Sequence, residues 1–265
     1  MIEALYQVVL GLVCGYLTIS VCESLFHRII QHASLRVRRF YAKVGRLGET
    51  CIQAWYSHHV VHHVLTYRRS HVRQFADSGE RARLDAHLAA KGRRDVIATR
   101  YGAAIGVRSR DFLWYMAPTL PFFVALCLLG GAWFSVGALF PLIAWPFLAQ
   151  VVHPYLHMSY DEIATTAPTW FRAFARTRYF RCLAQHHWLH HHYGDCNFNL
   201  LQGGDLLLRV HRTASEKDLR DMRAIGLWVA EHAVDRPTDL DEAHQRLQIH
   251  CGSGCQVNRN PNDNG

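Results

Sequence analysis

Two long stretches of this chain lack any charged side chain. Residues 4–22 and residues 112–160 contain no Asp, Glu, Lys or Arg. A helix needs about 20 apolar residues to cross a hydrocarbon core of about 30 Å. The first stretch therefore predicts one membrane span. The second stretch is divided near its middle by Gly130-Gly131 and predicts two spans that run out and back.

Positive charge is also missing from two regions. None of the 29 Lys and Arg residues lies in residues 1–27 or 111–171. Because positive loops stay in the cytoplasm, three spans place the N-terminus outside and residues 27–110 and 153–265 inside. The start Met1-Ile2-Glu3 offers no positive segment, which argues against a cleaved signal peptide. The net charge of +8 needs no nucleic-acid partner, since no nucleic-acid motif is present and anionic membrane lipids suffice.

The chain carries no reductase of its own. It has no GxGxxG after a strand, no four-cysteine iron–sulfur spacing and no His-Pro-Gly-Gly haem element. Any oxidation would draw electrons from a separate ferredoxin, cytochrome or flavoprotein. The eight cysteines are scattered, and the pair Cys251 and Cys255 beside His250 lies in a segment rich in Gly, Ser, Asn and Pro. We therefore predict a disordered tail at residues 251–265 after one domain at residues 1–250.

Histidine, by contrast, is abundant. Ten of the 19 histidines form four clusters with the spacings H-x4-H, H-x2-H-H, H-x3-H and H-x2-H-H. The clusters are His27/His32, His59/His62/His63, His153/His157 and His187/His190/His191. Neutral imidazole is the commonest metal-ligand side chain. One ion takes about four to six ligands, so ten imidazoles predict two metal ions.

The spacing of each cluster suits convergence on one point. Residues three and four apart share a face of an α-helix, as in His59/His62/His63 and His187/His190/His191. His27 and His32 are five apart, so they need a helix end or a π-bulge to converge, or else they serve different ions. Three flanking histidines are candidates for contact with the site or for surface positions: His58, His186 and His192. We interpret the isolated ones as ordinary surface residues: His71, His87, His211, His232, His244 and His250. The competing interpretation of the clusters is a basic, pH-sensing surface.

In order and spacing, the clusters resemble the integral-membrane fatty acid hydroxylase and sterol desaturase superfamily. The matching segments are FHRIIQH, HVVHH, HPYLH and HWLHH, and the resemblance runs from about residue 20 to residue 210. The segment HYGDCNFNLLQGGDLLL is similar to the family's Asn-aromatic stretch that leads to an Asp. It departs from the family at Asn199, where Gly is common, and at Gly204, where Trp is common. These departures leave the metal site intact and put the substrate class in doubt.

The resemblance implies a chemistry and a set of partners. Its members bind two metals, natively iron, on the cytosolic side and use dioxygen to attack C–H bonds of lipids. It therefore implies hydroxylation of a fatty acyl, sterol or isoprenoid substrate. Imidazole ligands also suit zinc, so we expect that zinc can replace iron in a purified sample. Asp161, Glu162 and Asp195 lie close to the clusters and are candidates to orient imidazoles. Candidates for the pocket wall are Trp145, Phe147, Tyr155 and Trp188.

Three alternatives stay open from the residues alone. The same scaffold could desaturate its substrate, imidazoles also suit a zinc-dependent hydrolase, and a membrane protein could bind metal without catalysis. The expected fold is all-α, with three or four spans, three being favoured, and a cytoplasmic helical cap that holds the two metals. Residues 168–185 predict a helix in the membrane interface, and the bacterial inner membrane is the expected location.

Overall fold

The computed structural model describes residues 1–67, 70–90 and 116–227. These residues form helices and connecting loops, with no strand among them, so the predicted all-α class is confirmed for this part of the chain. The predicted tail at residues 251–265 lies outside the described residues.

The elements are α1 (Ile2–Phe26), η1 (His27–Gln31), α2 (Leu35–Tyr41), α3 (Arg46–Trp55), η2 (Tyr56–Leu65), α4 (Ser78–Ala90), α7 (Leu120–Phe147), η3 (Leu148–Val152), α8 (His153–Leu156), α9 (Tyr160–Thr166), α10 (Thr169–Ala175), α11 (Arg178–Tyr193), α12 (Gly204–Leu207) and α13 (Glu216–Ala224). Those labelled η are π-helices.

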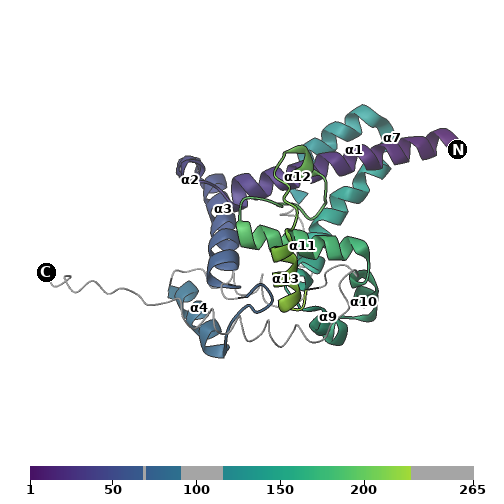
Figure 1. Cartoon of the computed structure of the whole chain (residues 1–265). Coiled ribbons are helices and arrows are strands. Elements are labelled where there is room, and N and C mark those ends of the chain that lie inside the picture. Colours follow the sequence, from purple (N-terminus) through teal and green to yellow (C-terminus); the bar gives the residue numbers. More distant parts are fainter. Residues whose placement is uncertain (68–69, 91–115, 228–265) are drawn as a thin grey trace, which may run out of the picture.

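Two continuous helices are long and apolar enough to cross a membrane: Ile2–Gln31 and Leu120–Leu156. Figure 1 shows α1 and α7 projecting together from one side of the remaining helices. The first helix agrees with the predicted first span. The second breaks at Gly131, whose φ of 76° and ψ of −170° are not helical. The described arm before this break, residues 120–130, rises only about 16 Å, whereas residues 132–156 rise about 37 Å. The third predicted span is therefore not shown.

Small residues let α1 and α7 approach closely. A Cβ atom added at Gly11 would lie 2.0 Å from the carbonyl oxygen of Phe134, and one added at Gly137 would lie 1.9 Å from that of Val8. These distances are far shorter than a van der Waals contact, so the two backbones touch. Helices in lipid associate through such small-residue contacts, because lipid tails provide no hydrophobic drive between them.

We expect Gly137→Ala to destabilise this pair of helices. The added methyl group forces the helices apart, which costs about 1–3 kcal/mol for an overpacked contact and lowers the Tm of the purified protein by several degrees. Val136→Ala is the matched control, because Val136 lies next to it on α7 and is 55% exposed. A Tm equal to that of the control would show that the two helices do not pack as described.

The rest of the core lies where the long helices meet α9, α10 and α11. Tyr155 and Phe171 are both buried and stack with ring centroids 3.7 Å apart. The single interfacial helix expected over residues 168–185 is instead two helices, α10 and α11. They separate at Thr177, whose hydroxyl accepts a hydrogen bond from the Phe180 amide and caps α11. This cap sets the start of α11, the helix that carries His187, His190 and His191.

Candidate metal centre

The four histidine clusters meet in the interior of the helical assembly. Their ring nitrogens form two groups, and within each group the candidate ligand atoms lie within 4.8 Å of one another. The first group is His27, His32, His58 and His190, and the second group is His62, His157, His187 and His191. Each group draws on η2, on α11 and on the helix end of one candidate span. Two sets of four imidazoles are thus placed to hold two metal ions.

The separations between ring nitrogens match those of ligands around one ion. In the first group, the Nε2 atoms of His27 and His58 are 2.7 Å apart. In the second group, the Nε2 atom of His157 lies 2.8 Å from that of His187 and 3.2 Å from that of His62. A metal–nitrogen bond of about 2.0–2.1 Å gives edges of about 3.0–3.4 Å between neighbouring ligands. The imidazoles therefore already have roughly the spacing of a coordination shell.

Main-chain carbonyls fix which nitrogen of the ring faces each group. The Nδ1 atom of His190 donates to the carbonyl of Cys196 at 2.9 Å, and that of His157 donates to the carbonyl of His71 at 2.9 Å. His27 makes the same contact with the carbonyl of Phe198. Each Nε2 atom is then left with a lone pair that points at other imidazoles. The Nε2 atom of His190 is buried without a hydrogen-bond partner. A bound cation would satisfy these lone pairs, so the residues fit a metal.

The π-helices explain how unevenly spaced histidines converge. In η1 the amide of His32 donates to the carbonyl of His27 at 2.8 Å, an i to i+5 bond. Of the alternatives that the five-residue spacing left open, the structure has the π turn, and it places His27 and His32 in the same group. The element η2 is also a π-helix, where we expected an α-helix. Because residues four and five apart share a face of a π-helix, His58 aligns with His62 and His63.

Three predicted ligands lie beside the two groups. His63 and His153 are adjacent to them, with Nε2 atoms 3.0 Å from those of His58 and His187, respectively. The ring of His59 stacks on Trp55, and its Nδ1 atom lies 3.3 Å from that of His32. Seven of the ten predicted ligands thus lie in the groups. His58, a flanking candidate, occupies the position that we expected for His59.

Substitution of His58 and of His59, one at a time, tests which of these two neighbouring histidines binds metal. We expect His58→Ala to weaken metal binding by the first group about tenfold or more, as loss of an orienting partner alone does. His59→Ala should weaken binding less and leave the metal stoichiometry unchanged, because His59 contacts His32 but is not a member of the group. Elemental analysis after dialysis against a weak chelator measures both. The reverse order of sensitivity would contradict the π-helical register of η2.

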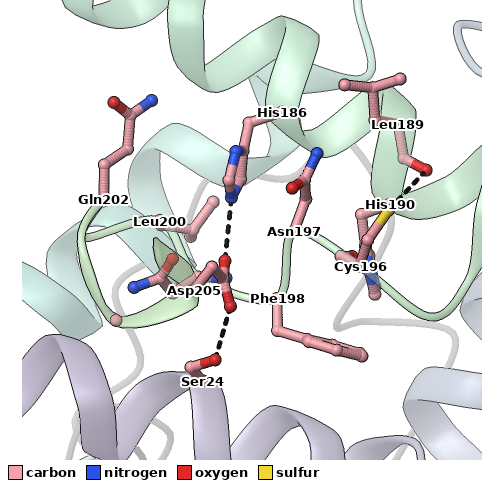
Figure 2. Close-up of polar contacts among 12 residues, drawn as sticks. Ser24, His186, Leu189, His190, Cys196, Asn197, Phe198, Leu200, Gln202 and Asp205 are labelled. Atoms are coloured by element: carbon pink, nitrogen blue, oxygen red, sulfur yellow. Dashed lines mark hydrogen bonds and ion pairs between the residues drawn. The ribbon is translucent and has the colours of Figure 1, made fainter. Parts of the chain in front are cut away.

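Asp205 anchors the loop that follows α11. Figure 2 shows its carboxylate between His186 and Ser24. It accepts from the ring nitrogen of His186 at 3.0 Å, from the hydroxyl of Ser24 at 2.5 Å and from the amide of Asn199 at 2.9 Å. Asp205 is 1% exposed, so this buried carboxylate ties α1, α11 and the loop together. The loop in turn presents the carbonyls of Cys196 and Phe198 to the first group.

The acidic residues expected to orient imidazoles lie elsewhere. Asp161, Glu162 and Asp195 are solvent-exposed. Asp161 and Glu162 occupy the first turn of α9, whose cap is Ser159. The orienting contacts come instead from main-chain carbonyls, and Asp205 holds the loop that carries two of them. Of the other flanking histidines, His186 joins the Asp205 network, and the exposed His192 stacks on Trp188.

His71 is the histidine that the sequence analysis missed. We expected an ordinary surface residue, but His71 is only 8% exposed. Its Nε2 atom donates to the carbonyl of Leu156 at 3.0 Å, and its own carbonyl accepts from His157. The neighbouring ring of Tyr67 stacks on His157 with centroids 3.9 Å apart. Tyr67 and His71 therefore cover the second group. A lone histidine forms no spacing pattern, so the sequence could not have predicted this role.

Burial keeps the imidazoles neutral. It lowers the pKa of His190 from its ordinary value of 6.5 to about 4 and that of His71 to about 3. Burial also holds the pKa values of His62, His157 and His187 well below 6.5. A neutral ring keeps the lone pair that a metal needs, so the site is prepared for metal binding at neutral pH.

The same shifts predict how acid affects the metal-free protein. Below about pH 6.5 the unfolded chain binds protons at these imidazoles, whereas the folded chain binds one at His190 only near pH 4. The free energy of unfolding therefore decreases as the pH falls from 6.5 to 4, by up to about 1.4 kcal/mol per pH unit for each such imidazole. Melting curves of metal-free protein across this range would measure it. A constant Tm would show that the rings are not buried in their neutral form.

A cavity of about 40 Å³ lies against both groups. His27 and His58 line it from the first group, and His187 lines it from the second. The other side is formed by the ends of the candidate spans, with Glu23, Phe26, Trp145 and Ala149. Of the expected wall residues, Trp145 lines this cavity, whereas Tyr155 and Trp188 are packed in hydrophobic clusters and Phe147 is 41% exposed. The cavity thus lies between residues of both histidine groups and residues near the ends of the two candidate spans.

Comparisons of the chain with family models, with curated proteins and with solved structures find no match. The resemblance carried by the histidine clusters therefore stays a prediction. The fold and the two histidine groups rest on the structure itself.

Proposed function

We propose that this protein is a membrane-bound oxygenase with two metal ions, natively iron, that hydroxylates a C–H bond of a hydrophobic substrate. The observation that carries the proposal is the pair of four-histidine groups built from helices that are far apart in the sequence. Two all-imidazole groups side by side exceed what a structural zinc site needs, since such a site closes with four ligands. Bound iron would supply the redox chemistry that lets dioxygen oxidise a C–H bond.

The surface of the long helices supports membrane insertion. A core helix of a soluble protein is mostly buried, but only 17% of the most apolar window of Leu120–Leu156 is buried, and 39% of that of Ile2–Gln31. Leu128, Leu129 and Phe140 are 82%, 87% and 69% exposed. A soluble monomer does not leave so many large apolar side chains in water. The bilayer is the environment that would cover them.

The residues of the site favour a nitrogen-bound redox metal. The ligand groups contain imidazole only. The nearby Cys196 thiol contacts the carbonyl of Leu189, and burial raises its pKa to about 11, which keeps it protonated and a poor ligand. The site is therefore unlike thiolate zinc sites. Imidazoles suit iron and copper as well as zinc, so the metal itself must be measured.

The cavity supports a hydrophobic substrate. Phe26, Trp145 and Ala149 provide apolar surface on one side of it, beside the carboxyl group of Glu23, and His27 and His187 line the other side. An acyl or isoprenoid chain that enters between the ends of α1 and α7 would bring one carbon near both groups.

The decisive experiment combines iron-loaded protein in lipid with a ferredoxin and its reductase, candidate lipids and isotopically labelled dioxygen. We expect a product that is heavier by one labelled oxygen atom and that requires oxygen and reductant. A product that lacks two hydrogens would identify a desaturase on the same scaffold. Equal turnover of zinc-loaded protein without oxygen or reductant would contradict the oxygenase and favour a hydrolase.

A further inference from the structure

The segment that follows the first long helix is strongly basic. No Asp or Glu lies between Glu23 and Glu49, whereas six cations do: Arg28, Arg36, Arg38, Arg39, Lys43 and Arg46. Within the described residues, none of these six forms an ion pair with a carboxylate. The segment therefore carries positive charge that no described carboxylate pairs with, next to the end of a candidate span.

The helix α2 is held firmly in place by its inner face. The guanidinium of Arg38 lies over the ring of Trp55, 3.9 Å from its centroid, and the hydroxyl of Tyr41 donates to the carbonyl of Ile29 at 3.3 Å. At Gly48 an added Cβ would lie 1.8 Å from the carbonyl oxygen of Tyr41, so α3 packs directly on the end of α2. The outer face of α2 therefore has a fixed position.

That outer face combines cations with apolar side chains. Leu35, Arg36, Arg39, Phe40 and Lys43 line an open hollow of about 450 Å³. Its volume is more than ten times the roughly 30 Å³ that one water molecule occupies in the liquid. All five residues are exposed, Leu35 by 55% and Phe40 by 62%. Arg36, Arg39 and Lys43 follow helical spacing and share one side. The hollow therefore offers three cationic donors at one place, beside two uncovered apolar side chains.

We propose that this hollow binds the phosphate headgroup of an anionic phospholipid. Arg and Lys would contact the phosphate, and Leu35 and Phe40 would lie among the first carbons of the acyl chains. The site rests on the membrane insertion in the proposed function but not on the oxidation. The helix α2 begins at Leu35, four residues after η1 ends at Gln31. It therefore lies where the first long helix would leave the apolar layer of the membrane. Uncovered apolar side chains next to the cations favour a lipid over a soluble acidic protein.

Lipid retention by the purified full-length protein tests this site. Protein in neutral detergent is mixed with phosphatidylglycerol and phosphatidylcholine, and native mass spectrometry measures how much of each stays bound. We expect phosphatidylglycerol to be preferred about tenfold or more, because each cation near an anionic surface strengthens binding about fivefold. Inorganic phosphate at millimolar concentration should not displace it. Displacement by free phosphate would indicate a simple anion site, and equal retention of both lipids would overturn the proposal.

Matched variants test whether the phospholipid binds at this hollow. Arg36→Gln, Arg39→Gln and Lys43→Gln together should remove the preference. The control exchanges three exposed cations elsewhere, with Arg81→Gln, Arg83→Gln and Arg223→Gln, and should keep the preference at the same loss of charge. If the triple variant does not fold, Phe40→Ser and Lys43→Gln are measured singly, and each should weaken retention. Loss in the control variant, or retention in all site variants, would overturn the proposal. Metal content and turnover are measured in separate experiments. The lipid result could therefore still be interpreted if the oxygenase proposal failed.

Discussion

Replacing His190 by Ala is expected to abolish oxidation, with turnover reduced by more than about a thousandfold. His190 is fully buried, and its ring lies 4.6 Å from that of His27 and 4.7 Å from that of His32, centroid to centroid. Its loss removes a ligand of the first group and opens a space at its centre. We expect bound metal to fall from two ions to one per chain, as measured by elemental analysis beside product formation.

The control for this result is His87→Ala. His87 is exposed on α4 and lies outside both groups, so its removal should change neither metal content nor turnover. If His190→Ala protein kept two ions and full turnover, the first group would not be a metal site. If it kept two ions but lost turnover, His190 would act on the reaction without holding metal.

Filling the cavity is expected to stop turnover and leave the metals in place. Ala149 lines the cavity of about 40 Å³, which is too small to hold an additional phenyl ring as well as substrate. Ala149→Phe should therefore reduce product formation about a hundredfold or more while both ions stay bound, because a displaced substrate loses its alignment with the reacting atoms. Product yield and elemental analysis on the same samples separate the two effects.

Ile143→Phe is the matched control for the cavity, because Ile143 lies on the same helix and is 45% exposed. It adds a phenyl ring of the same size to the outer face and should leave turnover near that of the unmodified protein. Full activity of Ala149→Phe would show that substrate does not use this cavity. Loss of metal in that variant would show that the cavity wall supports the ligands.

Much of this arrangement was predictable from the sequence. The gaps in charge locate the two long helices, because a helix in lipid tolerates few charged side chains. The number and spacing of the clustered histidines predict two metal groups. The five-residue gap between His27 and His32 left a π turn as one of three alternatives, and η1 provides it. Such patterns are local, and local patterns are what a sequence displays.

The remainder depends on contacts between distant segments. The choice of His58 over His59 follows from the helix type of η2, which spacing alone does not determine. The role of His71 depends on its own carbonyl oxygen, which accepts a hydrogen bond from His157, 86 residues further along the chain. Asp205 stood in the segment that resembles the family, but only the fold shows that it contacts Ser24 across 181 residues. The exposed Asp161 and Glu162 show that closeness in sequence to a cluster does not bring a side chain to it.

The hydrogen bonds that orient His27, His157 and His190 all end on peptide oxygens. A peptide oxygen is present whatever side chain its residue carries, so single substitutions at Phe198, His71 or Cys196 cannot delete it. A mutational scan would therefore undervalue these three positions. Insertions or deletions in residues 196–204 would displace two of these oxygens, those of Cys196 and Phe198. The loop should therefore tolerate changes in length far less than changes in composition.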